Sequence, residues 1–211
     1  MLIVALTGGI ATGKSVVARI FEELGCYIHH ADQVAHALMK PDAPAWRPIV
    51  EHFGTGILRA DRTIDRDLLG ARVFSRAEDR MFLNRLLHPL VLEEKKEVIA
   101  RLEVQGHYRI FVSEAALTIE AGLLDLFHKV VVTYCSRELQ IQRLRQRGGT
   151  SRREALQKIR SQMPAKQKLA YGDYIIHTGG NLAATIEQAE RVYRHLHQDY
   201  RLMSSSLEEE D

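Results

Sequence analysis

The sequence predicts a doubly wound α/β fold, in which helices cover both faces of a five-stranded parallel sheet. Five short apolar runs predict the strands: Leu2–Leu6, Tyr27–His30, Tyr108–Val112, Lys129–Thr133 and Tyr174–Ile176. Their apolarity is continuous rather than alternating, which is typical of strands that are covered on both faces. The intervals between them leave room for the crossover helices that parallel strands require.

Helices are expected in those intervals. The predicted ranges are Ser15–Leu24, a long helical region from about 32 to 102, Arg137–Arg147, Arg152–Leu169 and Leu182–Tyr200. The first has apolar residues at helical spacing, and the last is amphipathic. Four of the five ranges follow a strand, and Arg152–Leu169 follows the helix before it, so the order of elements supports the doubly wound arrangement.

One domain over residues 1–203 is expected, with two additions to a simple α/β core. The core takes 1–31 and 106–200. The interval of about 32–105 is too long for one crossover and predicts a helical subdomain that binds an acceptor. A basic stretch with two glycines, Gly148 and Gly149, predicts a lid over about 143–160. Residues 204–211 are serines followed by acids and are expected to be a disordered tail.

The composition excludes several classes of protein. Lys and Arg number 29 against 27 Asp and Glu, so the charge of +2 gives no reason to expect nucleic acid or a membrane surface as partner. Cys26 and Cys135 are too few for a disulfide framework or a metal cluster. No apolar run approaches the ~20 residues that span a bilayer. A cytoplasmic protein, monomeric or weakly homo-oligomeric, is expected.

The strongest motif follows the first strand and fits G-x-x-x-x-G-K-[ST], the phosphate-binding loop or P-loop. It consists of Gly8, Gly9, Ile10, Ala11, Thr12, Gly13, Lys14 and Ser15, with Val16 next in the following helix. Glycines let the backbone wrap a phosphate chain, and the start of the helix directs its positive end at the phosphates. Lys14 is expected to reach the β- and γ-oxygens of ATP, and Ser15 to ligate Mg²⁺.

Two acidic residues follow other predicted strands. Asp32 comes after the second strand, which is expected to neighbour the P-loop strand, and its carboxylate could accept a proton from an attacking hydroxyl. The alternative is that Asp32 only caps the next helix. Glu114 closes the third strand and could hold Mg²⁺ through a water molecule, or it could be a helix cap or a solvated acid.

The chain resembles the dephospho-CoA kinase family through a series of ordered matches over about four fifths of its length. Besides the P-loop, the matching segments include Ala31-Asp32, Ile64-Asp65-Arg66-Asp67, Leu86-Leu87-His88-Pro89, Gln142-Arg143-Leu144 and Gln162-Met163-Pro164. The resemblance implies ATP-dependent phosphorylation of the ribose 3′-hydroxyl of dephospho-CoA, with ATP and dephospho-CoA as substrates and Mg²⁺ as cofactor.

The same resemblance implies roles for individual residues. Asp32 would be the catalytic base, together with Lys14 and Arg143 as catalytic residues. Arg147 would bind ATP from beside the lid. The acceptor side would consist of Thr7, Asp32, Arg66, His88 and Pro89. Two of these readings have structural alternatives: the lid arginines could be a solvated face, and His88-Pro89 could end one helix and begin the next.

The sequence departs from the family pattern at three places. His30 stands where the family usually has an aspartate, two residues before the catalytic one. Ala116 and Thr178 replace the family's proline and asparagine in two loops on the nucleotide side. The change at His30 bears on assistance from a second carboxylate, but not on Asp32 itself. The changes at Ala116 and Thr178 bear on adenine contacts rather than on the reaction.

Two other functions fit part of the pattern. A nucleoside or nucleoside-monophosphate kinase would share the P-loop, the strand-end acid and the arginines. It would leave the segments around Arg66 and His88 unexplained. A nucleotide-gated binding module would need a water-orienting residue and exposed apolar switch surfaces, and neither is identified in the sequence.

Overall fold

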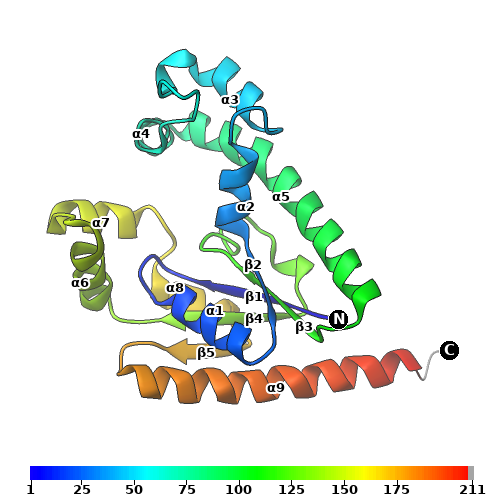
Figure 1. Cartoon of the computed structure of the whole chain (residues 1–211). Coiled ribbons are helices and arrows are strands. Elements are labelled where there is room, and N and C mark those ends of the chain that lie inside the picture. The colour runs from blue at the N-terminus through cyan, green and yellow to red at the C-terminus, as the bar shows by residue number, and fades with distance from the viewer. Residues whose placement is uncertain (209–211) are drawn as a thin grey trace. The chain divides into compact units, whose positions relative to one another are not determined.

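The computed structural model describes residues 1–208, except for the side chains of residues 74 and 206–208. The chain forms two compact units (Figure 1). The first comprises Met1–His29 and the chain from Leu102 onward, and the second comprises His30–Arg101.

The first unit is built on the five-stranded parallel sheet that the sequence predicts. Its strands are β1 (Leu2–Gly8), β2 (Tyr27–His30), β3 (Ile110–Glu114), β4 (Lys129–Tyr134) and β5 (Tyr174–His177). The order is β2-β3-β1-β4-β5. In the register, Leu6 lies opposite Glu114 and Gly8 opposite Thr133, so the end of β1 is flanked by the ends of β3 and β4.

The expected position of the second strand is wrong. β2 neighbours β3 at the edge of the sheet, and β3 lies between β2 and the P-loop strand β1. Burial explains the order, because β3 is buried along nearly all its length while three of the four β2 residues are only half-buried. An apolar strand belongs in the interior of a sheet. The ends of β1 and β2 are therefore two strand spacings apart, roughly 10 Å.

Two helices pack against one face of the sheet. They are α1 (Lys14–Glu23) and α9 (Leu182–Glu208). Phe21 of α1 and Leu196 of α9 are fully buried in a core with Leu6 and Val131 of the sheet. On the opposite face, alternate strand residues such as Val132 pack against short irregular segments that include η2 (Leu124–Leu126) and η3 (Leu169–Tyr171).

The chain between β4 and β5 forms three helices. They are α6 (Arg137–Gly148), α7 (Arg152–Arg160) and the short α8 (Ala165–Lys168). The single predicted helix over Arg152–Leu169 is therefore wrong. Proline disfavours helical dihedrals in the residue before it and has no N–H to donate, so Pro164 separates α7 from α8 and serves as the N-cap of α8.

The second unit is helical. Its elements are α2 (Ala31–Leu38), α3 (Trp46–Phe53), η1 (Thr55–Ile57), α4 (Arg66–Ser75) and most of α5 (Ala77–Gln105). A core of its own includes Ile49, Phe53, Leu69 and Leu87. α5 continues through Pro89, so the alternative in which His88-Pro89 separates two helices is wrong. Position 89 donates no backbone hydrogen bond, but the helical bonds on either side maintain the helix.

The end of the chain is also more ordered than predicted. α9 extends to Glu208, so the prediction of a disordered tail is wrong for residues 204–208. The hydroxyl groups of Ser204 and Ser205 donate to the carbonyls of Tyr200 and Arg201, one turn earlier, which lets serine fit within a helix. Residues 209–211 of the predicted tail lie outside the described residues. No helix within residues 1–208 is both long and apolar enough to cross a membrane.

Candidate active site

The P-loop connects β1 to α1 in the first unit. Gly13 is the N-cap of α1, with φ of 88°, and no side chain caps the helix. The first amides of a helix have no partner within it, and they carry the positive end of the helix dipole. The loop therefore presents N–H groups to an anion, as the sequence predicts for a phosphate cradle.

Gly8 shows why the loop needs glycine where it leaves the strand. Its φ is 152°, and a Cβ at this position would lie 2.3 Å from Thr133 Oγ1 and 2.6 Å from the Thr133 carbonyl oxygen. β4 is a central strand, so its backbone cannot retreat without breaking sheet pairing. A side chain at position 8 would instead displace the loop.

We expect Gly8→Ala to lower the affinity for ATP by about 10-fold or more, because shifting the loop misaligns the amides that hold the phosphates. Isothermal titration calorimetry with a non-hydrolysable ATP analogue measures the effect. Gly25→Ala is the matched control, since Gly25 also has a positive φ but has no neighbouring atom within 4 Å of the added Cβ. Equal affinities of the two variants would contradict the steric argument.

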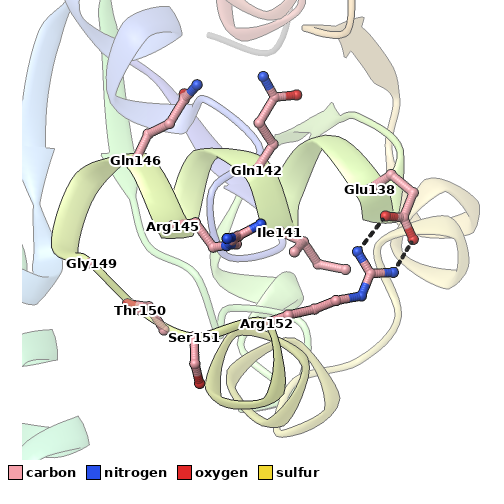
Figure 2. Close-up of a pocket in the computed structure, with 9 residues that line it drawn as sticks. All are labelled: Glu138, Ile141, Gln142, Arg145, Gln146, Gly149, Thr150, Ser151 and Arg152. Atoms are coloured by element: carbon pink, nitrogen blue, oxygen red, sulfur yellow. Dashed lines mark hydrogen bonds and ion pairs between the residues drawn. The ribbon is translucent and has the colours of Figure 1, made fainter.

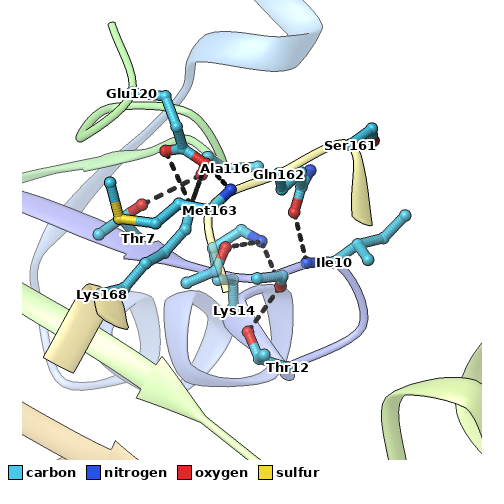
Figure 3. A network of polar contacts seen from close by, with 12 residues as sticks. Thr7, Ile10, Thr12, Lys14, Ala116, Glu120, Ser161, Gln162, Met163 and Lys168 are labelled. Atoms are coloured by element: carbon cyan, nitrogen blue, oxygen red, sulfur yellow. Dashed lines mark hydrogen bonds and ion pairs between the residues drawn. The ribbon is translucent and has the colours of Figure 1, made fainter. Parts of the chain in front are cut away.

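Lys14 folds over the loop. Its ammonium donates to the carbonyls of Gly8 at 3.2 Å and Gly9 at 3.3 Å. Thr12 Oγ1 donates to the same Gly9 carbonyl at 2.8 Å (Figure 3). The ammonium is thus held at the mouth of the cradle, where it can also donate to phosphate oxygens.

Ser15 and Glu114 form the second polar feature of the cradle. Ser15 Oγ donates to Glu114 Oε1 at 3.1 Å. The hydroxyl lies in the first turn of α1, and the carboxylate ends β3, the strand next to β1. A hydroxyl beside a carboxylate offers the oxygen ligands that Mg²⁺ prefers. Among residues 1–208 no cluster of three or more His, Cys, Asp or Glu could hold a metal by itself.

Arg143 lies on the outer side of the loop. Its guanidinium donates to the Thr178 carbonyl at 2.6 Å and to the Ala11 carbonyl at 3.2 Å. Thr178 Oγ1 in turn donates to the Thr12 carbonyl at 2.6 Å. Ala11 has a φ of 59°, a strained value for a residue with a side chain. These contacts stabilise the strained part of the loop.

A pocket of about 330 Å³ opens beside Gly13. It is lined by Gly13, Val16, Arg143, Gln146, Arg147, Thr178, Gly180, Leu182 and Thr185. The lining combines small apolar groups with two arginines, which suits a purine base and its phosphates. The structure thus brings the predicted ATP ligands Val16 and Arg147 to one cavity with the P-loop.

The segment predicted as a lid, about 143–160, covers the second half of α6, residues 149–151 and all of α7, and the two helices form a pair. Ile141 of α6 packs on Ala155 and Ile159 of α7. A second cavity of about 590 Å³ lies along the pair (Figure 2). At one end Arg152 donates two hydrogen bonds to the Glu138 carboxylate, at 3.0 and 3.1 Å. Gly149, with φ of 61°, makes the turn between the helices.

The predicted acceptor residues of the second unit lie on three helices. α2 begins at Ala31 after an N-cap at His30, so Asp32 is in the first turn and the alternative in which it serves as the cap is wrong. The Asp32 side chain is exposed. Burial lowers the pKa of His36, the charge of Arg66 lowers it further, and Asp32 raises it. Asp32, His36 and Arg66 therefore lie within electrostatic range of one another.

His88 and Thr7 are less accessible than the other acceptor candidates. His88 is half-buried in α5, and burial lowers its pKa, which favours a neutral imidazole. Thr7 has no exposed surface, and its hydroxyl donates to the Ala116 carbonyl at 3.4 Å. Thr7 thus supports the loop at residue 116, where the sequence departs from the pattern of the family it resembles.

Sequence reasoning missed several residues around the cradle. Gln140 Nε2 donates to the Ile10 carbonyl at 2.7 Å, and Gln162 Oε1 accepts from the Ile10 N–H at 2.8 Å. Lys168 is fully buried near the same loop. Gln162 lies in the segment Gln162-Met163-Pro164 that carries the family resemblance, so the sequence did draw attention to it. Lys168 had no such signal, because only the fold shows that this lysine is buried.

Comparisons with known proteins show which family the chain is similar to. The family model for dephospho-CoA kinase matches residues 2–184. The dephospho-CoA kinase of Halalkalibacterium halodurans is 41% identical over 187 residues, covering 89% of this chain and 92% of that protein.

Solved structures show the same similarity. The dephospho-CoA kinase from Campylobacter jejuni superposes with a TM-score of 0.66 and 28% identity, over 92% of this chain and 96% of that one. A Thermus thermophilus protein superposes with a TM-score of 0.79 and 26% identity over the same shares.

Proposed function

The chain belongs to the dephospho-CoA kinase family, and from that premise we propose how its residues divide the reaction between them. The protein catalyses ATP-dependent phosphorylation of dephospho-CoA in coenzyme A biosynthesis. The γ-phosphate goes to the ribose 3′-hydroxyl, and the products are coenzyme A and ADP. The observation that carries this function is a complete P-loop, with Lys14 at its mouth, in a chain that matches the family over residues 2–184.

The first unit is proposed to hold ATP. The amides of the P-loop bind the β-phosphate, and Lys14 reaches the β- and γ-oxygens from its position at the Gly8 and Gly9 carbonyls. The pocket beside Gly13 takes the adenosine, with Val16 and Arg147 in its wall. Arg143 contributes positive charge while it supports the loop. Charge and positioning are what a loose phosphoryl-transfer transition state requires.

The second unit is proposed to bind dephospho-CoA through Arg66, His88 and Pro89. Thr7, in the first unit, remains a predicted acceptor residue. A guanidinium such as Arg66 suits the phosphate groups of this acceptor. Asp32 accepts the proton of the 3′-hydroxyl as its oxygen forms a bond to the γ-phosphorus. The bond from that phosphorus to the bridging oxygen of ADP breaks in the same step.

Mg²⁺ is the proposed cofactor, since ATP-dependent kinases use a divalent ion. The hydroxyl of Ser15 and, through water, the carboxylate of Glu114 fit it, because they supply hard oxygen ligands at the phosphate cradle. When bound, the ion would neutralise charge on the β- and γ-oxygens. Glu114 orients the Ser15 hydroxyl, and this orientation does not depend on the nucleotide.

We expect Glu114→Gln to raise the Mg²⁺ concentration needed for half-maximal rate by about 10-fold, since outer ligands tune metal affinity to that extent. Initial rates at fixed ATP and varied free Mg²⁺ give the measurement. Glu187→Gln, an exposed change on α9, should leave the dependence unaltered. An unchanged Mg²⁺ dependence of the Glu114 variant would exclude Glu114 from the ion site.

The domain plan is part of the proposal. The compact unit of His30–Arg101 is assigned to the acceptor, and α6 with α7 is assigned to a lid over the nucleotide. A cytoplasmic location, a monomeric or weakly associated state, and the absence of nucleic-acid or membrane partners remain predictions from the sequence.

A coupled assay for ADP tests the function. ATP consumption should depend on dephospho-CoA, and mass spectrometry should identify coenzyme A as the product. Consumption that occurs only with a nucleoside or a nucleoside monophosphate would overturn the assignment of the acceptor. Slow hydrolysis that no acceptor accelerates would overturn the kinase function.

A further inference from the structure

A buried lysine connects two loops beside the phosphate cradle. Lys168, the last residue of α8, has no exposed surface. Its ammonium donates to the Ala116 carbonyl at 2.7 Å and pairs with the Glu120 carboxylate at 2.9 Å (Figure 3). Burying an ammonium is unfavourable unless it is paired and hydrogen-bonded, and both conditions are met here. The pair therefore joins the segment 116–120 firmly to α8.

The same carboxylate fixes the chain next to Gln162. Glu120 also accepts a hydrogen bond from the Met163 N–H at 3.0 Å. Gln162, the preceding residue, directs its Oε1 to the Ile10 N–H of the P-loop, 2.8 Å away. A continuous path of contacts thus runs from Lys168 to Glu120, from Glu120 to Met163 and the adjoining Gln162, and from Gln162 to the cradle.

The geometry of one peptide extends this path to Lys14. In a trans peptide the N–H and the C=O point in opposite directions. Gln162 holds the N–H of the Gly9–Ile10 peptide, so the Gly9 carbonyl points the other way. There it accepts hydrogen bonds from Lys14 Nζ at 3.3 Å and Thr12 Oγ1 at 2.8 Å. The orientation of this peptide therefore sets where the Lys14 ammonium lies.

The Ile10–Ala11 peptide, which comes next, is also held by a glutamine, in this case one from α6. Gln140 is buried in α6, and its Nε2 donates to the Ile10 carbonyl at 2.7 Å. The Ala11 N–H on the opposite side of that peptide is thereby turned away from Gln140. Gln162 and Gln140 thus form hydrogen bonds with the N–H and the C=O of Ile10, and neither bond requires a nucleotide.

We propose that Gln162 is a positioning residue for phosphoryl transfer, which orients the Gly9–Ile10 peptide and with it the Lys14 ammonium. The ion pair of the buried Lys168 with Glu120 holds Gln162 in place through the Met163 N–H. This inference deepens the proposed kinase function and rests on it.

The first test replaces Gln162 with leucine, which removes the acceptor and retains the bulk. We expect kcat to fall by about 10-fold, the loss of one well-placed hydrogen bond, with the KM for dephospho-CoA unchanged. Amide exchange at Ile10 should become faster, and Gln162→Glu, which keeps an acceptor oxygen, should restore protection. Gln198→Leu, the same change at an exposed position of α9, should alter neither quantity. Wild-type kcat or unchanged exchange at Ile10 in Gln162→Leu would overturn the proposal.

The second test asks whether Lys168 acts through Gln162. Lys168→Met alone would remove the cation that pairs with Glu120, so it is combined with Glu120→Gln. This double change is placed in a mutant cycle with Gln162→Leu. Non-additive losses of kcat are expected, because all changes interrupt one path. Additive losses would exclude that path. Glu120→Gln by itself enters the same cycle if the combination does not fold, and Lys166→Met on α8 is the exposed control.

Failure of this inference can be distinguished from failure of the proposed function. Amide exchange at Ile10 and the affinity for an ATP analogue are measured without an acceptor. If dephospho-CoA were not the acceptor, the exchange result would stand unchanged. If coenzyme A forms at the wild-type rate in Gln162→Leu, only the positioning role is overturned.

Discussion

Asp32→Asn is expected to lower kcat by about 10²-fold or more while the affinity for ATP is retained. An amide has nearly the shape of a carboxylate but cannot accept the proton of the 3′-hydroxyl. Asp32 lies in α2 and the P-loop in the other unit, so ATP binding has no direct need of it. Steady-state rates with dephospho-CoA and calorimetry with an ATP analogue separate the two effects.

Asp67→Asn is a close control for this experiment. Asp67 is exposed and holds the second position of α4, as Asp32 does in α2, so the loss of a negative charge near a helix start is the same in both variants. If the two variants turned over at comparable rates, Asp32 would not be the base.

Lys14→Ala should lower kcat/KM for ATP by about 10²- to 10³-fold, because the transition state loses a cation placed at the transferred phosphate. The variant also removes the hydrogen bonds that the ammonium donates to the carbonyls of Gly8 and Gly9, so some weakening of the empty loop is expected. Initial rates at varied ATP give kcat/KM, and thermal unfolding reports on the loop.

Lys166→Ala provides the comparison, since Lys166 is exposed on α8 in the same unit. Its kinetics should equal those of the wild type. A Lys14 variant with unchanged kcat/KM would contradict the assignment of the cradle, whatever the identity of the acceptor.

Local signals were sufficient for much of the fold. The five strands lie where continuous apolar runs predict them, and the third is displaced by only two residues. The P-loop was recognisable because its glycines, lysine and serine perform their roles within eight consecutive residues. Asp32 was predicted as the base because it lies two residues after the end of the second strand.

Errors arose where the outcome depends on distant residues. The place of β2 at the edge was decided by competition among strands for the buried centre of the sheet. Pro89 signals a break on its own, yet α5 continues because Leu87 beside it is packed in the core of the second unit. The separation of α7 from α8 was readable at Pro164 and was overlooked.

The sequence by itself determined the sheet, the phosphate loop and the family, because these follow from patterns of neighbouring residues. Only the tertiary structure decided that Lys168 is buried against Glu120 and that Gln162 meets Ile10, a residue 152 positions away. Such contacts depend on how several elements pack together. No local pattern encodes them, since the same glutamine or lysine on an exposed helix would have an identical sequence signature.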